Sequence, residues 1–254
     1  MVELPVPPHW VVVAILISAT VGGFLLVVRL ATSSAISFRY TTAFAFAVVA
    51  LGLFLGRGIH LSLFAGRVGE EHLLSFWKFW EGGYSILGFC LAPASLWYLS
   101  RCSGWRIRQV DTLVAATYVA LPFAQALGRI GCLLNACCYG WPTKVGPGVV
   151  YPPSSIPGMR FGPQELHPVQ IYEAVLNGAA FVVLLSLWRR GRNLRDIAGT
   201  YFLLYGVLRL AMQMVRADPW LRWGKVDLAS VLSVAMIVIG LSCIAWGRLV
   251  SRKG

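Results

Sequence analysis

Seven stretches of the chain are almost entirely apolar and are separated by more polar segments. An α-helix needs about 20 apolar residues to cross the roughly 30 Å hydrocarbon core of a bilayer. The pattern therefore predicts an all-α integral membrane protein of about seven transmembrane helices, at residues 10–30, 40–56, 84–100, 110–128, 169–188, 198–215 and 227–247. No internal repeat is visible and no long hydrophilic segment is attached, so we expect a single polytopic membrane domain over residues 1–254.

The composition agrees with a membrane protein. Hydrophobic residues make up 57% of the chain and charged residues 13%, against about 45–50% and about 25% in ordinary soluble domains. These values exclude a disordered chain, a coiled coil and a secreted disulfide scaffold. The net charge of +12 would suggest nucleic acid in a soluble protein, but in a membrane protein it indicates loops that face anionic headgroups. We expect membrane lipids as partners and no nucleic acid.

The basic residues between the predicted helices indicate how the chain crosses the membrane. The first, third and fifth connections and the C-terminal tail hold twelve Lys and Arg residues, and the remaining connections hold nine. Acidic residues further dilute the positive charge of the second group. By the positive-inside rule, the N-terminus is expected outside and the C-terminus in the cytoplasm.

One connection, residues 129–168, differs from the others in length and composition. It holds seven of the chain's 13 prolines and many glycines, so it is too broken to form one helix. Loops of this length are often lids or binding loops. The predicted orientation places this Pro/Gly-rich loop on the outer face.

Arg129 and Asn135 stand in a glycine-rich segment that begins this loop and runs to Gly140. Ionisable groups at membrane depth are costly and usually mark functional sites. Glycines there let a ligand or another backbone come close. The alternative is a helix end from which the arginine extends to the headgroups.

His167, Gln170, Tyr172 and Glu173 open the fifth predicted helix after Pro168, a residue that suits a first helical turn. The i, i+3 spacing puts Gln170 and Glu173 on one face. An acid near the positive end of the helix dipole is the alternative explanation for Glu173. It does not explain why three more polar groups enter a membrane span.

Arg209, Gln213 and Arg216 form a polar stripe, at i, i+4 and i+7, on an otherwise apolar helix. Arginines that point into one cavity imply an anionic partner, because guanidinium groups bind phosphate oxygens bidentately. A phosphate at the membrane surface most naturally belongs to a phospholipid. Ser85, at the start of the third predicted helix, is expected near the same outer face.

These segments together resemble the phosphatidylglycerol–prolipoprotein diacylglyceryl transferases of bacteria. The resemblance covers roughly residues 35–247 and rests on four motifs: Gly128-Arg129-Ile130-Gly131 with Asn135 and Gly140, His167-Pro168-x-Gln170-x-Tyr172-Glu173, Tyr205-Gly206-x-x-Arg209 with Arg216, and Gly-Gly-x-Ser at 82–85. It implies transfer of diacylglycerol from phosphatidylglycerol to the lipobox cysteine thiol of a prolipoprotein, with release of glycerol phosphate. It also implies a bacterial inner-membrane location, a site toward the outer leaflet, and no soluble cofactor.

Four positions depart from the pattern of that family. Leu87 stands where a His is usual, Cys132 where an Asn is usual, Cys137 where an acid is usual, and Gln213 where a Glu is usual. Leu87 cannot take a proton and Gln213 carries no charge. The residues for lipid binding are therefore better matched than those for thiol activation.

The reaction needs a stabilised phosphate leaving group and an activated thiol. Arg129 and Arg209 are expected to stabilise the phosphate. His167 and Glu173 are the candidate bases, and positive charge alone is a third way to lower the pKa of the substrate thiol. Together with Arg129, the residues expected to contact the lipid are Ser85, Asn135, Gly140, Gln170, Tyr172, Gln213 and Arg216.

Other functions compete with this interpretation. The four departures allow a related transferase with a different acceptor. A lipid or small-molecule transporter is a further alternative, but repeated halves are not visible. Cys132, Cys137 and Cys138 could bind a metal, but their spacing is irregular for zinc and no His lies beside them. We expect packed thiols and no metal.

Overall fold

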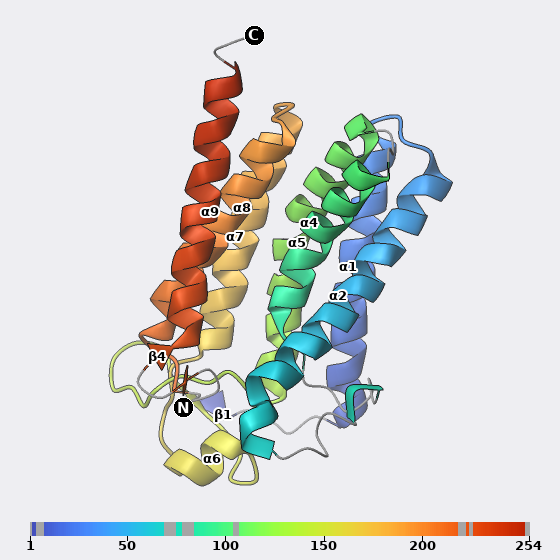
Figure 1. The fold of residues 1–254 in the computed structure, drawn as a ribbon. Coiled ribbons are helices and arrows are strands. Elements are labelled where there is room, and N and C mark those ends of the chain that lie inside the picture. The colour runs from blue at the N-terminus through green and yellow to red at the C-terminus, as the bar shows by residue number, and fades with distance from the viewer. Residues whose placement is uncertain are drawn as a thin grey trace. The chain divides into compact units, whose positions relative to one another are not determined.

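The structure is a computed structural model that describes residues 2–3, 8–68, 75–77, 84–103, 107–217, 222–223 and 226–251. Most of these residues are helical (Figure 1). The α-helices are α1 (His9–Thr32), α2 (Phe38–Val68), α4 (Ile86–Cys102), α5 (Ile107–Leu134), α6 (Ile156–Phe161), α7 (Val169–Arg189), α8 (Leu194–Gln213) and α9 (Leu228–Ser251). A 3-10 helix, η1, covers Ser75–Trp77.

Four two-residue strands pair outside the helices. Strand β1 (Val2–Glu3) pairs in parallel with β2 (Val149–Val150). Strand β3 (Arg222–Trp223) pairs antiparallel with β4 (Val226–Asp227) just before α9. These pairs join segments at the helix ends and add little regular structure.

Each of the seven predicted apolar stretches overlaps a helix, and three of them extend one or two residues beyond it. Five helices are long and apolar enough to cross a membrane, over Trp10–Thr32, Phe38–Ser62, Gln109–Leu134, Val169–Arg189 and Leu228–Leu249. Helix α4 is apolar but shorter, and α8 carries Arg209 and Gln213. The all-helical architecture is that of an integral membrane protein. Because α5 continues to Leu134, Arg129 lies on a helix and the loop begins at Asn135.

The contacts divide the chain into two compact units. The second unit, Phe24–Leu121, contains α2 and α4, which pack closely through glycines. A Cβ atom at Gly88 would overlap the backbone of Gly56. In the same unit Trp97 donates its indole N–H to Asp111 across 2.7 Å.

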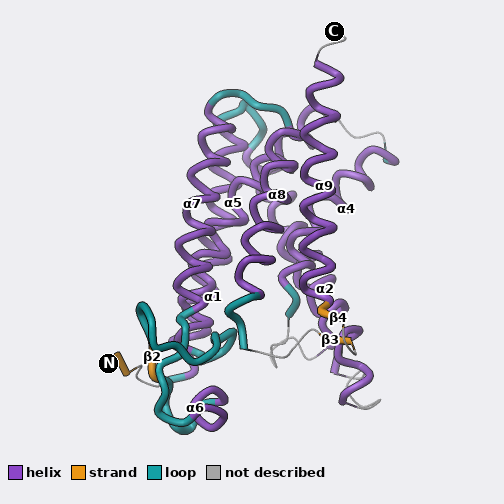
Figure 2. Tube along the Cα trace, turned by 90° about the vertical axis from the view of Figure 1, so that its left-hand side faces the viewer, coloured by secondary structure: helices purple, strands orange, loops and turns teal. Residues whose placement is uncertain are grey.

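The first unit, Met1–Gly23 with Pro122–Gly254, holds the polar residues predicted to form a site, except Ser85. Within it α8 packs against both α7 and α9. Glycines again allow close approach, since a Cβ atom at Gly206 would lie 2.8 Å from the Ser233 carbonyl oxygen. Figure 2 shows the loop with β2 and α6 gathered at the end of the unit where α7 begins.

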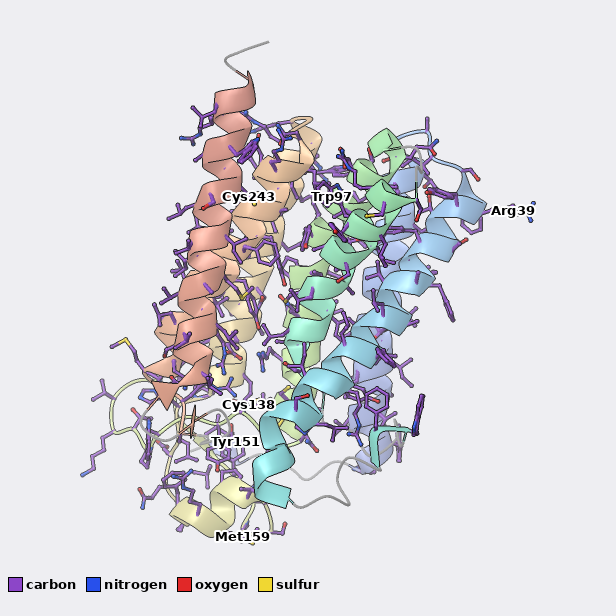
Figure 3. All side chains as sticks on the ribbon, in the orientation of Figure 1. Arg39, Trp97, Cys138, Tyr151, Met159 and Cys243 are labelled. Atoms are coloured by element: carbon purple, nitrogen blue, oxygen red, sulfur yellow. The ribbon has the colours of Figure 1, made fainter. Side chains whose placement is uncertain are left out.

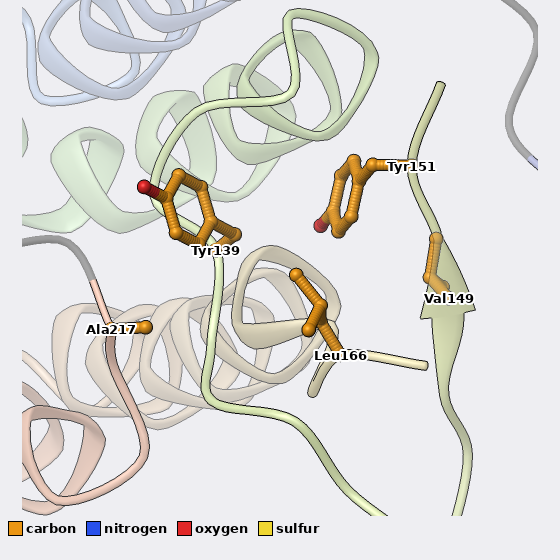
Figure 4. Packing of buried hydrophobic residues seen from close by; sticks show 5 residues of the cluster. All are labelled: Tyr139, Val149, Tyr151, Leu166 and Ala217. Carbon is orange, nitrogen blue, oxygen red and sulfur yellow. The ribbon is translucent and has the colours of Figure 1, made fainter. Parts of the chain in front are cut away.

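The loop has its own small apolar core. Tyr139, Val149, Tyr151, Leu166 and Ala217 are buried against one another (Figure 4). Backbone bridges join Gly140 to Arg216, and Leu166 to both Pro142 and Val149. The Pro/Gly-rich loop is therefore an ordered layer that also contains the short helix α6. It is tied to the segment that follows α8.

Candidate functional site: arginines around a buried carboxylate

Glu173 lies at the centre of an ionic cluster in the first unit. Its side chain is fully buried, and its carboxylate contacts three guanidinium groups. Arg129 Nε lies 2.7 Å from Oε2, Arg216 Nη1 lies 3.2 Å from Oε1, and Arg209 Nη1 lies 3.7 Å from Oε1. We call Arg129, Glu173, Arg209 and Arg216 the arginine cluster. The three arginines predicted separately from the sequence thus meet at one point.

Four segments bring the cluster together. Arg129 comes from the end of α5, Glu173 from the first turns of α7 and Arg209 from the last turns of α8. Arg216 follows α8, where its backbone bridges to Gly140 of the loop. The predicted shared face of Gln170 and Glu173 is confirmed, because both side chains are buried. Helix α7 therefore presents its polar face to the interior of the unit.

The cluster carries more positive than negative charge. Three guanidinium groups share one carboxylate, which leaves a formal excess of two positive charges. Among the residues that the structure describes, Arg209 Nη1 and Gln213 Oε1 are buried without a hydrogen-bond partner. The 3.7 Å from Arg209 Nη1 to Glu173 is too long for a good hydrogen bond. An anion that accepts this unused donor would satisfy both the charge and the geometry.

His167 lies apart from the arginine cluster, directly before α7. Its Nδ1 is 3.3 Å from the Tyr172 hydroxyl, and that hydroxyl is 3.5 Å from the Pro147 carbonyl oxygen. In the described part of the chain, no hydrogen bond or ion pair links His167 to Glu173. The two candidate bases therefore have different surroundings: a half-buried imidazole beside a phenol, and a carboxylate enclosed by arginines.

Gln170 links the loop to α7. Its side-chain N–H donates to the Cys137 carbonyl oxygen across 2.6 Å, and its Oε1 accepts from the Tyr151 hydroxyl across 3.1 Å. Burial raises the pKa of Tyr151 to about 12, so the phenol stays protonated and can donate at neutral pH. Sequence reasoning did not find Tyr151; its place in a proline-rich loop was the only signal. Gln170 thus serves to anchor the loop.

Gly140 allows two backbone segments to meet. Its N–H donates to the His167 carbonyl oxygen across 3.1 Å. A Cβ atom at Gly140 would lie 2.6 Å from His167 Cβ and 2.7 Å from the His167 carbonyl oxygen. The prediction that a glycine here admits another backbone is confirmed. The contact sets the position of His167 at the start of α7.

Three cysteine side chains converge beside Arg129. The Sγ atoms of Cys132, Cys137 and Cys138 all lie within 4.8 Å of one another. Arg129 Nη1 lies 3.6 Å from Cys138 Sγ and 3.9 Å from Cys132 Sγ. Hydrogen bonds from the other two thiols, with nearby Arg216 and Arg129, hold the pKa of Cys138 well below its ordinary value. We call these three residues the sulfur cluster.

The remaining predicted lipid contacts are more scattered. Asn135 is exposed. Ser85 lies in the second unit, where its hydroxyl accepts from the Leu87 N–H and caps α4. The glycines at 82–83 and Asp218 lie outside the described residues. The residues of the arginine cluster, in contrast, contact one another within the first unit.

Arg160 is a further residue that sequence reasoning missed. Its guanidinium donates to the Ala217 carbonyl oxygen across 2.8 Å. It also lies over the rings of Phe161 and Trp141, at 4.9 Å and 5.6 Å from their centroids. Arginine among aromatic residues in a loop is the signal that could have found it. Arg160 fixes α6 to the backbone next to Arg216.

Comparison with known proteins gives a consistent result. The sequence model of the prolipoprotein diacylglyceryl transferases matches residues 1–246. The phosphatidylglycerol–prolipoprotein diacylglyceryl transferase of Pseudomonas savastanoi pv. phaseolicola is 32% identical over 174 residues, covering 66% of this chain and 62% of the relative. The enzyme of that name from Symbiobacterium thermophilum is 27% identical over 245 residues, covering 93% of this chain and 85% of the relative. The match to the Pseudomonas protein thus spans less than two thirds of its length.

Proposed function

The chain belongs to the prolipoprotein diacylglyceryl transferase family, and from this premise we propose that it transfers diacylglycerol from phosphatidylglycerol to the lipobox cysteine of prolipoproteins. The observation that supports this most directly is the unused, buried Nη1 donor of Arg209 within a cluster of excess positive charge. Membership of the family supports the type of reaction, and the charge of the arginine cluster supports binding of the phosphate there.

The phosphate of the donor lipid would bind to the arginine cluster. Arg209 Nη1 donates to a phosphate oxygen, and Arg129 and Arg216 contribute charge from either side of Glu173. Charge grows on this phosphate as the bond to the glyceryl carbon breaks, so fixed guanidinium groups stabilise the transition state more than the bound lipid. Glu173 acts as a positioning residue, because its carboxylate holds three cations that would otherwise repel one another.

The transfer forms one bond and breaks one. The thiolate sulfur of the lipobox cysteine attacks the glyceryl carbon next to the phosphate ester oxygen, forming a thioether. The carbon–oxygen bond breaks and its electron pair leaves with the phosphate, as glycerol phosphate. His167 accepts the thiol proton, since its imidazole is half-buried and carries no ion pair in the described structure. Tyr172 holds the ring in place through its hydroxyl.

The same proposal places the protein in the bacterial inner membrane. The N-terminus would lie outside and the C-terminus in the cytoplasm, with the Pro/Gly-rich loop and the arginine cluster toward the outer leaflet. The excess of basic residues in the opposite connections supports this orientation. Lipid would reach the cluster from the outer leaflet, and the lipobox segment would reach it from the external face.

The test is a reconstituted assay with phosphatidylglycerol vesicles and a lipobox peptide, read by the mass of the peptide. Wild type should add a diacylglyceryl group. His167→Ala should lose transfer but still bind phosphatidylglycerol, because the arginine cluster is untouched. Arg39→Ala is a matched control, since Arg39 is exposed on α2 (Figure 3) and should have ordinary activity.

The different-acceptor alternative is decided by the same assay. This alternative is motivated by the four departures from the family pattern, at Leu87, Cys132, Cys137 and Gln213. If wild type is folded and binds phosphatidylglycerol but does not modify the lipobox peptide, the proposed acceptor is wrong. If it modifies the peptide at a rate similar to that of a known transferase, a different acceptor is excluded as its main substrate.

A further inference from the structure

The sulfur cluster is a feature that the transfer reaction does not use. Cys132 lies on the last turn of α5, and Cys137 and Cys138 lie at the beginning of the loop. Ala136 and Cys138 have left-handed backbones, with φ of 50° and 61°. These conformations reverse the chain and bring Cys137 and Cys138 back beside Cys132. Neither residue favours this conformation by itself, so the surrounding contacts must hold it.

The spacing of the three sulfur atoms suits a shared ion. Two thiolates bound to one metal at about 2.3 Å lie about 3.8–4.0 Å apart. The Sγ atoms here are already within 4.8 Å of one another. Small rotations of the side chains would bring them into binding distance, because all three are only partly buried. A disulfide would use two of the sulfurs and leave the third, whereas an ion uses all three.

Ligand type and charge both select a particular class of ion. Thiolates favour soft metal ions, and no His, Asp or Glu joins the three cysteines in the described part of the chain. Zinc usually takes four ligands, so the cluster supplies one too few for a closed zinc site. Three thiolates around a monovalent ion carry two negative charges, which favours a position beside a guanidinium group such as that of Arg129.

Arg129 provides the outer contacts that such a site needs. Its Nη1 lies close to two of the three sulfurs while its Nε binds Glu173. N–H groups directed at ligand sulfurs stabilise the thiolate form and fix the geometry of metal–sulfur sites. We propose that Cys132, Cys137 and Cys138 form a three-thiolate site for a soft monovalent metal ion such as Cu(I). The site adjoins the arginine cluster but does not depend on the transfer activity.

This proposal revises an expectation from the sequence. In the sequence, the spacing of the three cysteines disfavours a metal site because it is irregular for zinc. The structure removes that objection, since the left-handed residues at 136 and 138 change the path of the chain. Titration with a metal ion distinguishes packed thiols from a metal site.

The probe is Cu(I), titrated anaerobically into the full-length protein in detergent against a coloured Cu(I) chelator. Wild type should bind one Cu(I) per chain with three sulfur neighbours by X-ray absorption. Cys132→Ser, Cys137→Ser and Cys138→Ser should each weaken binding by more than about 100-fold, because even an outer-shell partner contributes 10–100-fold. The control variant carries Cys90→Ser, Cys102→Ser and Cys243→Ser, and it should bind Cu(I) like wild type. Figure 3 shows Cys243 on α9, well separated from Cys138.

A second measurement uses the wild-type protein alone. In wild type, bound Cu(I) should protect the three cluster cysteines from alkylation, read by peptide mass, and leave Cys102 reactive because it is exposed. The proposal is overturned if all six cysteines react equally with and without Cu(I). It is also overturned if a variant lacking all three cluster thiols binds Cu(I) as wild type does, or if the freshly isolated protein contains a disulfide between any two of them.

Discussion

At the scale of single residues, Glu173 balances three buried or nearly buried guanidinium groups. A charge buried in a protein interior is tolerated when it is paired, and removing one partner leaves the other uncompensated. Here one carboxylate compensates for three cations, so its charge matters more than in a simple ion pair. We therefore assign it a positioning role.

Glu173→Gln is expected to destabilise the protein while keeping the size of the side chain. Breaking a buried ion pair by neutralising one partner costs about 3–5 kcal/mol, and three cations are affected here. Thermal unfolding in detergent should show a clearly lower Tm. Asp196→Asn is the matched control, because Asp196 pairs with the exposed Arg192 across 3.8 Å and such pairs contribute about 0–1 kcal/mol. Equal Tm values for the two variants would contradict the central role of Glu173.

Arg209 is expected to contribute to binding of the phosphate and not to the stability of the fold. Arg209→Ala should lower the transfer rate by about 10²–10³-fold, the usual cost of losing one donor that stabilises developing charge. Arg209→Lys should recover little activity, because lysine keeps the charge but lacks the planar fork. Initial rates over a range of phosphatidylglycerol concentrations would measure both. Near-normal transfer by folded Arg209→Ala would refute phosphate binding at this residue.

At the scale of elements, the ordered loop determines where the site residues stand. Its bridges to Leu166 and Arg216, and the hydrogen bond from Gly140 to His167, connect α5, α7 and α8 at one end of the first unit. Arg160 adds a link from α6 to the backbone after α8. The position of His167 relative to the loop thus depends on Gly140.

Two glycines of the same motif should respond oppositely to alanine. Gly140→Ala places a Cβ atom 2.6 Å from His167 Cβ, so we expect a lower Tm and weak transfer. Gly128→Ala meets nothing within 4 Å and lies inside α5, so it should raise stability by about 0.5–1 kcal/mol. Thermal unfolding and the peptide assay on both variants test this. A tolerated Gly140→Ala would show that the loop can move away from α7.

The helices and the residues of the arginine cluster could be predicted from the sequence, but the contacts between these residues could not. Apolar runs are local signals, so each predicted run overlaps a helix, although the helix bounds differ. Charged residues within or beside apolar runs are also a local signal, and they predicted Arg129, Glu173 and Arg209 as site residues. Their pairing depends on contacts between three helices, which no local pattern contains. Asn135 shows the limit, since it belongs to the motif but its side chain is exposed.

The sulfur cluster was unpredictable for a different reason. Its geometry depends on positive φ values at Ala136 and Cys138, which residues with a Cβ atom rarely adopt. A helical or extended path through these positions would separate the thiols. Tyr151 was missed similarly, because its hydrogen bond to Gln170 requires the folded path of the whole loop.

At the scale of the whole molecule, the orientation in the membrane decides which substrates can reach the site. Reporter fusions after Gly191, between α7 and α8, should read cytoplasmic, and fusions after Gly146 in the loop should read external. The bias of basic residues gives this direction. Paired alkaline phosphatase and fluorescent-protein fusions would measure it. A cytoplasmic reading at Gly146 would contradict transfer at the outer leaflet.

The ion pair between Glu173 on α7 and Arg209 on α8 also bears on how this chain is inserted into the bilayer. Helix α8 holds Arg209 within its length and is less apolar than the five helices suited to cross alone. Helix α7, which carries Glu173, is synthesised before α8, which carries Arg209. A short turn between Arg189 and Leu194 joins the two helices, so the two side chains can pair. Entry as a hairpin would neutralise the arginine during insertion and lower its cost in lipid. The Glu173 carboxylate, which holds the arginine cluster together in the folded protein, would thus also promote the insertion of α8 into the bilayer.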